Sequence, residues 1–270
     1  MPATYDLSGS IALVTGAAGD IGRATATRIA ASGARLIVTD LELAAAGLER
    51  TRRQCAQLAG EDAVASISAD LAAPGNVAAL FDAATYRFGA PGLVFNNAGI
   101  QGALIGLADY PVDDFPRVME VNVETIFYVL RETARRLRSE GRGGSIVNSA
   151  SMAGVEGAAN MVAYSASKGA IMSMTRSASK DLAPLGIRVN AISPAFIGPG
   201  RMWDLQTVRQ AEAASQYYST DVEEVKREMV NMVPMRRLGT LDEVAATVVW
   251  LLSDEASYIT GHNLVVSGGI

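Results

Sequence analysis

The sequence is poor in the two side chains that most often bind metals or form covalent cross-links. Its 270 residues include one cysteine, Cys55, and one histidine, His262. A single cysteine excludes an internal disulfide framework and a cysteine-based zinc site. A single histidine excludes a histidine cluster around a metal and disfavours a Ser-His-Asp triad. We therefore predict no metal site, and any catalysis must use other side chains.

Positive charge and long apolar runs are also scarce. The chain has 23 Lys and Arg against 28 Asp and Glu, a net charge of −5, which argues against nucleic acid or a membrane surface as a partner. No apolar run approaches the roughly 20 residues of a membrane span, and the N-terminus lacks a signal pattern. These absences predict a soluble, cytoplasmic protein, and a hydrophobic content of 49% predicts a large core.

Short apolar runs alternate with longer amphipathic runs along the chain, a pattern typical of an α/β protein. Strands are expected at 11–15, 36–39, 64–69, 93–96, 145–149, 188–193 and 264–266. Helices are expected at 21–32, 42–58, 76–88, 113–138, 162–183 and 241–252. No linker or repeat divides the chain, so the prediction is one domain, 1–270, with a doubly wound Rossmann fold around a seven-stranded parallel sheet.

The segment 194–236 interrupts this alternation. It begins with SPAFIGPGRMW, which is rich in Pro and Gly, and then becomes polar and amphipathic. A long insertion after a strand's carboxyl end is where α/β folds place loops that grip ligands. An ordinary surface loop is the alternative, but Phe196, Met202 and Trp203 are too apolar for a surface without a partner. We therefore predict a substrate lid.

The first strand leads into the glycine-rich turn TGAAGDIG, residues 15–22. A turn of this kind between a strand and a helix lets backbone N–H groups approach a pyrophosphate. The glycines stand at 16, 19 and 22, so the spacing is GxxGxxG rather than GxGxxG. The pattern is weak alone, and its position on the first strand and helix strengthens it.

Two acidic residues follow the next two strands. Asp40 lies where a carboxylate would accept hydrogen bonds from a ribose and repel a 2′-phosphate, so it predicts NAD rather than NADP. A helix N-cap is the alternative role for Asp40. Asp70 follows the third strand, where it either accepts from the adenine amino group or stabilises a turn.

Tyr164 and Lys168 form the motif YSASK within a predicted helix. Spacing i, i+4 puts both side chains on one helix face. A neighbouring ammonium lowers the pKa of a phenol, which then exchanges a proton with an alcohol or carbonyl oxygen. The pair alone is common by chance. The motif NNAG at 96–99, Asn122 among apolar residues, and Ser151 after the fifth strand strengthen the assignment.

With these motifs in this order, the chain resembles the short-chain dehydrogenase/reductase superfamily over nearly its whole length. The resemblance implies a catalytic tetrad in which Tyr164 is the acid/base, Ser151 binds the substrate oxygen, Lys168 holds the nicotinamide ribose and Asn122 anchors a proton-relay water. The cofactor residues it implies are Gly16, Gly19, Asp20, Ile21, Asp40, Leu41, Asp70, Leu71, Asn97, Gly99, Tyr164, Lys168, Pro194 and Ile197.

Two positions depart from the family pattern. Asp20 replaces a usual glycine, so its carboxylate must turn away from the pyrophosphate or bind a ribose hydroxyl. Ala195 replaces the glycine that usually follows Pro194, which excludes a positive φ at low cost.

Several loop segments, among them NNAGIQGAL, ISPAFIGPGRMW and VPMRRLG, resemble the bacterial NAD-dependent xylitol (polyol) dehydrogenase group of that family. The implied reaction oxidises a secondary alcohol of a polyol to a ketose. The candidate substrate residues are Gln101, Ser151, Met152, Asn160, Tyr164, Met202 and Trp203.

Two other functions remain open from the sequence. The apolar side chains of the lid also suit a dehydrogenase for cyclic or aryl ketones. A non-catalytic NAD-binding scaffold is a third reading, which the complete Ser–Tyr–Lys set opposes. The family resemblance further implies a homotetramer, formed partly by the helices that carry Asn122 and Tyr164.

Overall fold

The computed structural model describes residues 5–270 and contains one seven-stranded sheet in which every strand is parallel to its neighbours. The strand order is β3-β2-β1-β4-β5-β6-β7, so the chain winds outward in both directions from β1 and β4. The strands are β1 Ile11–Thr15, β2 Arg35–Asp40, β3 Val64–Ser68, β4 Leu93–Asn96, β5 Gly144–Ser149, β6 Ile187–Pro194 and β7 Asn263–Val266. The predicted doubly wound Rossmann fold is confirmed.

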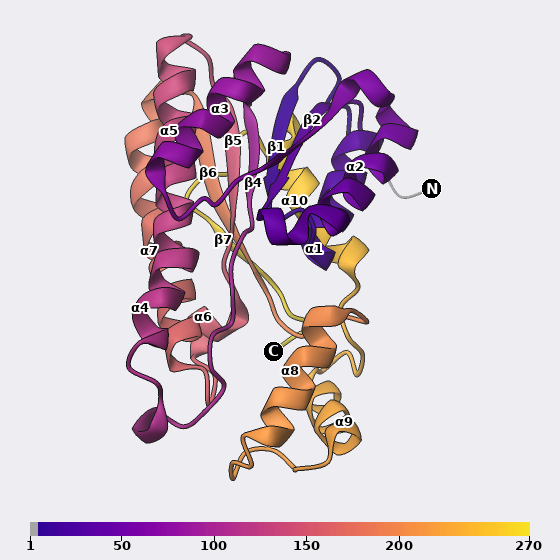
Figure 1. Cartoon of the computed structure of the whole chain (residues 1–270), viewed down its shortest axis with the longest axis vertical. Helices are drawn as coiled ribbons and strands as arrows, with labels where there is room; N and C mark the ends of the chain where they lie inside the picture. The colour runs from indigo at the N-terminus through magenta and orange to yellow at the C-terminus, as the bar shows by residue number, and fades with distance from the viewer. Residues whose placement is uncertain (1–4) are drawn as a thin grey trace.

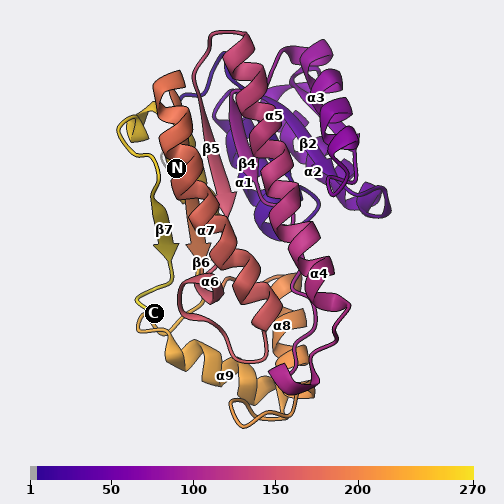
Figure 2. The same cartoon turned by 90° about the vertical axis from the view of Figure 1, so that its left-hand side faces the viewer.

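Helices cover both faces of the sheet (Figures 1 and 2). One face is packed by α1, α2 and α10, and the other by α3, α5 and α7. The helices are α1 Asp20–Ala31, α2 Ala45–Ala59, α3 Pro74–Phe88, α4 Asp114–Met119, α5 Thr125–Ser139, α6 Met152–Glu156, α7 Val162–Leu182, α8 Arg201–Glu212, α9 Val222–Met232 and α10 Leu241–Leu252. Within residues 5–270, no helix has both the length and the apolar character needed to cross a bilayer.

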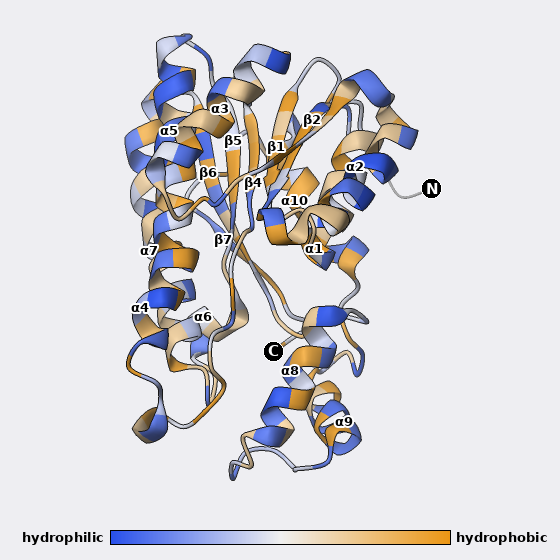
Figure 3. Ribbon diagram, in the orientation of Figure 1, coloured by the Kyte–Doolittle hydropathy of each residue, from blue (hydrophilic) through white to orange (hydrophobic). Residues whose placement is uncertain are grey.

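The central strands are mostly apolar because both faces of the sheet are covered, as the orange of β1, β2 and β4 in Figure 3 shows. Along β1, Ala12 and Val14 pack against the α1–α2–α10 layer, whereas Ile11 and Leu13 pack against the α3–α5–α7 layer. All of β1 is buried, and β1 lies between β2 and β4. Its carboxyl end and the turn that follows are therefore near the middle of the sheet edge.

The predicted long helix at 113–138 is interrupted in the structure. It divides into α4 and α5, which are joined by a π-helical turn over Glu120–Glu124 that contains Asn122. The extra residue of such a turn redirects the side chains that follow it, and apolar periodicity alone does not reveal it. The short helix α6, immediately after Ser151, was also not anticipated.

The segment after β6 lies beyond the carboxyl ends of the strands, toward which the arrows of β5 and β6 point in Figure 2. It contains α8 and α9, which contact each other and form their own small core around Trp203, Val225 and Met229. Phe196 lies edge-on to Trp203 with 6.0 Å between ring centroids. The apolar side chains of this segment are therefore partly used in holding α8 against α9.

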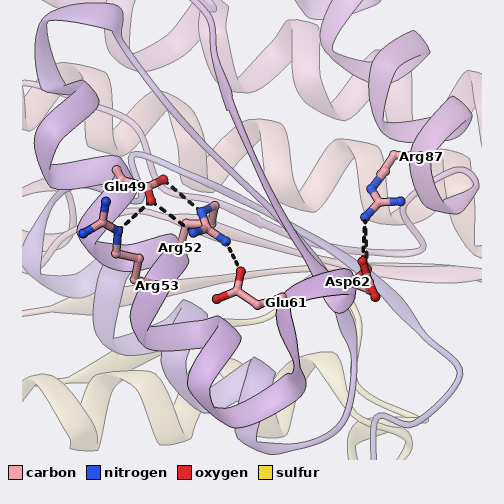
Figure 4. A network of polar contacts seen from close by, with 6 residues as sticks. All are labelled: Glu49, Arg52, Arg53, Glu61, Asp62 and Arg87. Carbon is pink, nitrogen blue, oxygen red and sulfur yellow. Dashed lines mark hydrogen bonds and ion pairs between the residues drawn. The ribbon is translucent and has the colours of Figure 1, made fainter.

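Ion pairs join α2 to the surface turn that follows it (Figure 4). Arg52 contacts Glu49 at 2.9 Å and Glu61 at 2.7 Å, and Arg53 contacts Glu49 at 2.8 Å. Arg53 and Glu61 are largely exposed and Arg52 is half-buried, so solvent and salt screen these pairs and their effect on stability is small.

The turn between β1 and α1 depends on two glycines. Gly16 has a φ of +62°, the left-handed region that glycine adopts without strain. Gly22 is in α1, and a Cβ atom there would overlap the carbonyl oxygen of Gly16. The first turns of α1 therefore pack directly on the backbone of the preceding loop, which brings the helix N-terminus to the end of β1.

The substitution Gly22→Ala is expected to lower the free energy of unfolding by about 1–3 kcal/mol, because the backbone at Gly16 must move to accept the methyl group. Thermal or denaturant unfolding measures this. Gly19→Ala is the matched control, since its Cβ would meet nothing closer than the Gly16 oxygen at 3.4 Å. Equal losses of stability in both variants would contradict the packing argument.

Candidate active site

A cavity of about 540 Å³ lies at the carboxyl ends of the central strands. Its walls come from the β1–α1 turn, the loops after β2, β3, β4 and β5, helix α6, and the segment that carries α8. Because parallel strands direct all their carboxyl ends to one edge, residues far apart in sequence meet there. The lining includes Asp20, Asp40, Asp70 and Glu156 but, within residues 5–270, neither lysine nor arginine.

Most predicted cofactor residues line this cavity. They are Gly16, Gly19, Asp20, Ile21, Asp40, Leu41, Asp70, Leu71, Asn97, Gly99, Tyr164, Pro194 and Ile197. Lys168 is the exception, because it is buried behind the wall. The N-terminus of α1 offers backbone N–H groups to a phosphate, whereas the N–H groups of Ala17, Ala18 and Gly19 already donate to β2 or within the turn. These residues fit a dinucleotide.

Asp40 ends β2, and its two carboxylate oxygens accept backbone hydrogen bonds on both sides. Ala18 in the glycine turn donates at 2.9 Å and Leu41 donates at 2.8 Å. No helix is capped by this side chain, since the following 3₁₀ turn begins without a side-chain cap. The carboxylate is therefore fixed at the cavity wall, with a negative charge where a ribose is expected.

Asp70 also lines the cavity, and its carboxylate accepts a hydrogen bond from the N–H of Ala72 at 3.1 Å. The turn-stabilising role is therefore present in the structure. The position at the cavity wall is also compatible with an adenine contact.

Tyr164, Ser151 and Lys168 come together as the motif predicts. The Ser151 hydroxyl lies near enough to the Tyr164 phenol to lower the pKa of that phenol, and both residues line the cavity. The Lys168 ammonium donates to the carbonyl of Ser149 at 2.7 Å and lies 5.5 Å from the centre of the Tyr164 ring. Ser151 is the N-cap of α6, and its hydroxyl accepts from Ala153 at 3.2 Å. The hydroxyl is thus held at the start of α6, beside the phenol.

The protonation equilibria differ from the expectation. Burial raises the pKa of the Tyr164 phenol, and the hydrogen bond with Ser151 lowers that pKa by less. Burial also lowers the pKa of the Lys168 ammonium to about 8. The protein's own groups therefore do not give the lowered Tyr164 pKa that the sequence suggested, because desolvation of the phenolate outweighs them.

Asn122 is fully buried behind the cavity and does not line it. Its amide nitrogen donates to the carbonyl of Ile100 and to the hydroxyl of Ser167, both at 2.9 Å, and its oxygen accepts from the Ile100 N–H at 2.7 Å. A Cβ on Gly99 would lie 2.9 Å from that oxygen and 3.6 Å from the Lys168 nitrogen. The π-helical turn thus anchors the loop that separates Asn122 from the lysine.

Asn97 joins β4 to the glycine turn. Its backbone N–H donates to the Thr15 hydroxyl at 2.8 Å, and its amide donates to the carbonyls of Thr15 at 3.1 Å and Gly16 at 3.3 Å. The Asn97 amide nitrogen therefore holds the start of the glycine turn against the loop after β4.

Gln101 and Gln206 face each other across the other end of the cavity. The Gln101 amide lies 3.5 Å from the carboxamide oxygen of Gln206 on α8, and both residues line the cavity. Gln101 is 6% exposed, and its own carboxamide oxygen has no hydrogen-bond partner within residues 5–270. A buried acceptor of this kind is costly unless a ligand or water donates to it.

The other predicted substrate residues divide into two groups. Ser151, Met152, Tyr164, Met202 and Trp203 line the cavity. Asn160 does not, because its amide donates to Gln210 on α8 and to Ser215, both at 3.0 Å. The structure uses Asn160 to hold the lid, and Arg209 on the same helix donates to the carbonyl of Gly102 at 3.3 Å.

The two departures from the family pattern are accommodated. Ala195 has no positive φ, and its N–H donates to the carbonyl of Val266 at 3.0 Å as an extension of the β6–β7 pairing. The Asp20 carboxylate turns away from the glycine turn and accepts from the N–H of Arg201 at 2.8 Å.

Sequence reasoning missed several cavity residues: Val121, Thr125, Glu156, Gln206, Tyr218, Met232 and Leu241. Glu156 could have been found from its place five residues after Ser151. Gln206, Tyr218 and Met232 lie in the lid, where no motif or strand end fixes their positions.

Comparison with known proteins gives consistent results. A model of the family described as enoyl-(acyl carrier protein) reductase matches residues 16–270. The crystal structure of an NAD+-bound xylitol dehydrogenase is similar with a TM-score of 0.93 and 44% sequence identity, covering 97% of this chain and 99% of that chain.

Two curated relatives have similar coverage and lower identity. Levodione reductase of Leifsonia aquatica is 32% identical over 96% of this chain and 93% of its own length. Cyclohexanol dehydrogenase of Acinetobacter sp. (strain SE19) is 35% identical, again over 96% of this chain and 93% of its own length. The cyclohexanol and xylitol dehydrogenases are both named for the oxidation of an alcohol.

Proposed function

Because the chain belongs to the short-chain dehydrogenase/reductase family, we propose that it uses NAD to oxidise a secondary alcohol of an uncharged polyol, such as xylitol, to the ketose, and that it catalyses the reverse reaction. The chain is an oxidoreductase that acts on alcohols or ketones with a nicotinamide cofactor. The choice of NAD over NADP, the polyol and the roles of individual residues are the proposal.

The selection of NAD is supported by charge. Asp40 fixes a carboxylate at the cavity wall, and no lysine or arginine in residues 5–270 lines the cavity to offset a 2′-phosphate. Two like charges about 4 Å apart repel by roughly 4 kcal/mol at an effective dielectric near 20, and the partial exposure of Asp40 reduces this. The xylitol dehydrogenase structure at 44% identity is described as NAD+-bound.

The bound nicotinamide supplies the hydride acceptor or donor. Tyr164 takes the hydroxyl proton of the alcohol as base and returns a proton to the ketone oxygen as acid. Ser151 holds the same substrate oxygen, since it already contacts the phenol. Tyr164 would be deprotonated more readily with oxidised NAD bound, since a positive charge near the phenol favours the phenolate that burial disfavours.

Gln101 is the observation that carries the polyol proposal. Its carboxamide oxygen is buried in the cavity without a partner, and Gln206 approaches it from α8. A substrate with several hydroxyl groups would donate to the free oxygen and accept from the amide. A cyclic ketone with one oxygen would leave these groups unpaired, at a cost of about 1–3 kcal/mol.

A cyclic or aryl alcohol is the second candidate because the same cavity has apolar walls. Met152, Met161, Phe196, Met202 and Trp203 line it. The levodione reductase and cyclohexanol dehydrogenase relatives, both near one-third identity, act on ring compounds by their names. Initial rates with NAD across polyols and cyclic alcohols separate the two candidates.

We also propose that the chain is one domain, 1–270, with residues 194–236 as its substrate lid, and that it assembles as a homotetramer. The lid proposal is supported by α8, which contributes Met202, Trp203 and Gln206 to the cavity. Phe115 and Phe127 on α4 and α5, 40% and 45% exposed, support contact between copies through these helices.

The pH dependence of the two directions is expected to be opposite. Oxidation requires the Tyr164 phenolate, whose pKa burial raises, so its kcat/KM rises with pH. Reduction requires the phenol, so its kcat/KM falls over the same interval. Tyr164→Phe is the control, with a rate expected to be about 10²–10⁴-fold lower. A Phe variant that retained wild-type rate and pH profile would remove Tyr164 from the mechanism.

Asp40→Asn is expected to raise kcat/KM with NADP relative to NAD by about tenfold, because the amide preserves an acceptor for Ala18 while the charge disappears. Steady-state kinetics with both dinucleotides measure the ratio. Asp70→Asn is the matched control, because it also neutralises a carboxylate at a strand end. Residue 70 is expected to face the adenine, which NAD and NADP have in common, so the ratio should not change. An unchanged ratio in Asp40→Asn would oppose the assignment.

Gln101→Met is expected to lower kcat/KM for xylitol by about tenfold or more, because the polyol hydroxyls need the carboxamide. The kcat/KM for cyclohexanol should stay the same or rise. Gln210→Met is the control for general damage to the lid, because Gln210 contacts Asn160 and does not line the cavity. It should affect both alcohols alike. Parallel losses in the Gln101 variant would favour the cyclic candidate.

A further inference from the structure

We propose that Asp20 is a positioning residue that latches the lid to the pyrophosphate-binding turn, so that the lid and the dinucleotide are held together. Its carboxylate accepts a hydrogen bond from the backbone N–H of Arg201 at 2.8 Å, across 181 positions of sequence. Asp20 begins α1 and Arg201 begins α8. One side chain therefore links the start of the helix expected to face the pyrophosphate to the start of the lid helix.

The need for this bond follows from the sequence of α8. The first N–H groups of any α-helix have no partner within the helix, and an N-cap side chain usually accepts from one of them. In α8 the N-cap is Gly200, which has no side chain. Asp20 supplies the missing acceptor from another part of the fold, and its negative charge suits the positive end of the helix dipole.

The fit between Asp20 and Gly200 is close. A Cβ on Gly200 would lie 2.7 Å from the carboxylate oxygen that accepts from Arg201, so any larger residue would push this oxygen away. The second carboxylate oxygen contacts Arg23 at 2.8 Å, and the Asp20 side chain is 17% exposed. The carboxylate is therefore oriented by one helix while it caps the other.

The remaining side-chain links of α8 lie farther along the helix. Gln206, Arg209 and Gln210 contact Gln101, Gly102 and Asn160, which belong to the loop after β4 and the segment before α7. These contacts hold the substrate side of the lid. The Asp20 bond holds its beginning, where both Asp20 and Gly200 line the cavity beside the glycine turn.

The consequence is kinetic. If the beginning of α8 moves away from α1, the cofactor end of the cavity opens. Ser151 at the start of α6, and Tyr164 and Lys168 on α7, stay in place. Loss of the latch should therefore speed release of the dinucleotide and raise the KM for the alcohol, and should leave the hydride-transfer step unchanged. This inference requires only a nicotinamide dinucleotide and is independent of the polyol proposal.

The test compares Asp20→Ala with Asp20→Asn in the full chain. Stopped-flow fluorescence measures NADH dissociation, and pre-steady-state measurement of NADH formation with the best alcohol isolates the chemical step. We expect Asp20→Ala to release NADH about tenfold faster with an unchanged chemical step, as loss of one charge-assisted hydrogen bond implies. Asp20→Asn keeps an acceptor for the Arg201 N–H, so its rate of NADH dissociation should stay close to that of the wild type.

Two further variants test the latch if thermal unfolding shows that Asp20→Ala is unstable. Gly200→Ala should reproduce fast NADH release by displacing the carboxylate, and combining it with Asp20→Ala should add nothing further. Arg23→Ala removes the side chain that orients the Asp20 carboxylate, so its rate of NADH release should lie between those of the wild type and Asp20→Ala. Unchanged NADH release in both Asp20→Ala and Gly200→Ala would overturn the latch, as would additive effects in the double variant.

Discussion

The parallel alignment of all seven strands is the constraint on which the site depends. It directs every carboxyl end to one edge of the sheet, so the loops after β1, β2, β3, β4 and β5 meet there without any long excursion of the chain. In the first of these loops, the absence of a side chain at Gly22 lets α1 pack directly against the Gly16 carbonyl. A cavity lined from these five strand ends and from the end of β6 follows from that arrangement.

Buried polar groups then fix the reactive residues relative to this edge. Lys168 reaches the carbonyl of Ser149, and Asn122 satisfies both backbone groups of Ile100 from the π-helical turn. These bonds are made in low dielectric, where an unpaired partner is costly, so they select one arrangement of the loops after β4 and β5. The same low dielectric raises the Tyr164 pKa and lowers the Lys168 pKa. Burial thus both fixes the loops after β4 and β5 and shifts the pKa values of Tyr164 and Lys168.

The sequence was sufficient for the features that local patterns encode. Apolar runs located the strands, and the i, i+4 spacing of Tyr164 and Lys168 placed them on one helix face. The π-helical turn at Asn122 was not predictable, because its extra residue leaves the apolar periodicity nearly intact. The partners of Asp20, Asn160 and Gln206 were also not predictable, since each lies in the lid or contacts it and no strand register relates the two. Contacts between loops depend on tertiary packing, which local sequence does not specify.

The distribution of charge around the cavity disfavours anionic forms of the proposed substrate. The substrate end carries Glu156, and no cationic side chain in residues 5–270 lines any part of the wall. A phosphate ester entering there would lose its hydration without gaining a counter-charge. If the proposed ketose is phosphorylated by a kinase after release, it can no longer return to be reduced. Phosphorylation outside the enzyme would thus drive net oxidation, although the hydride transfer itself is reversible.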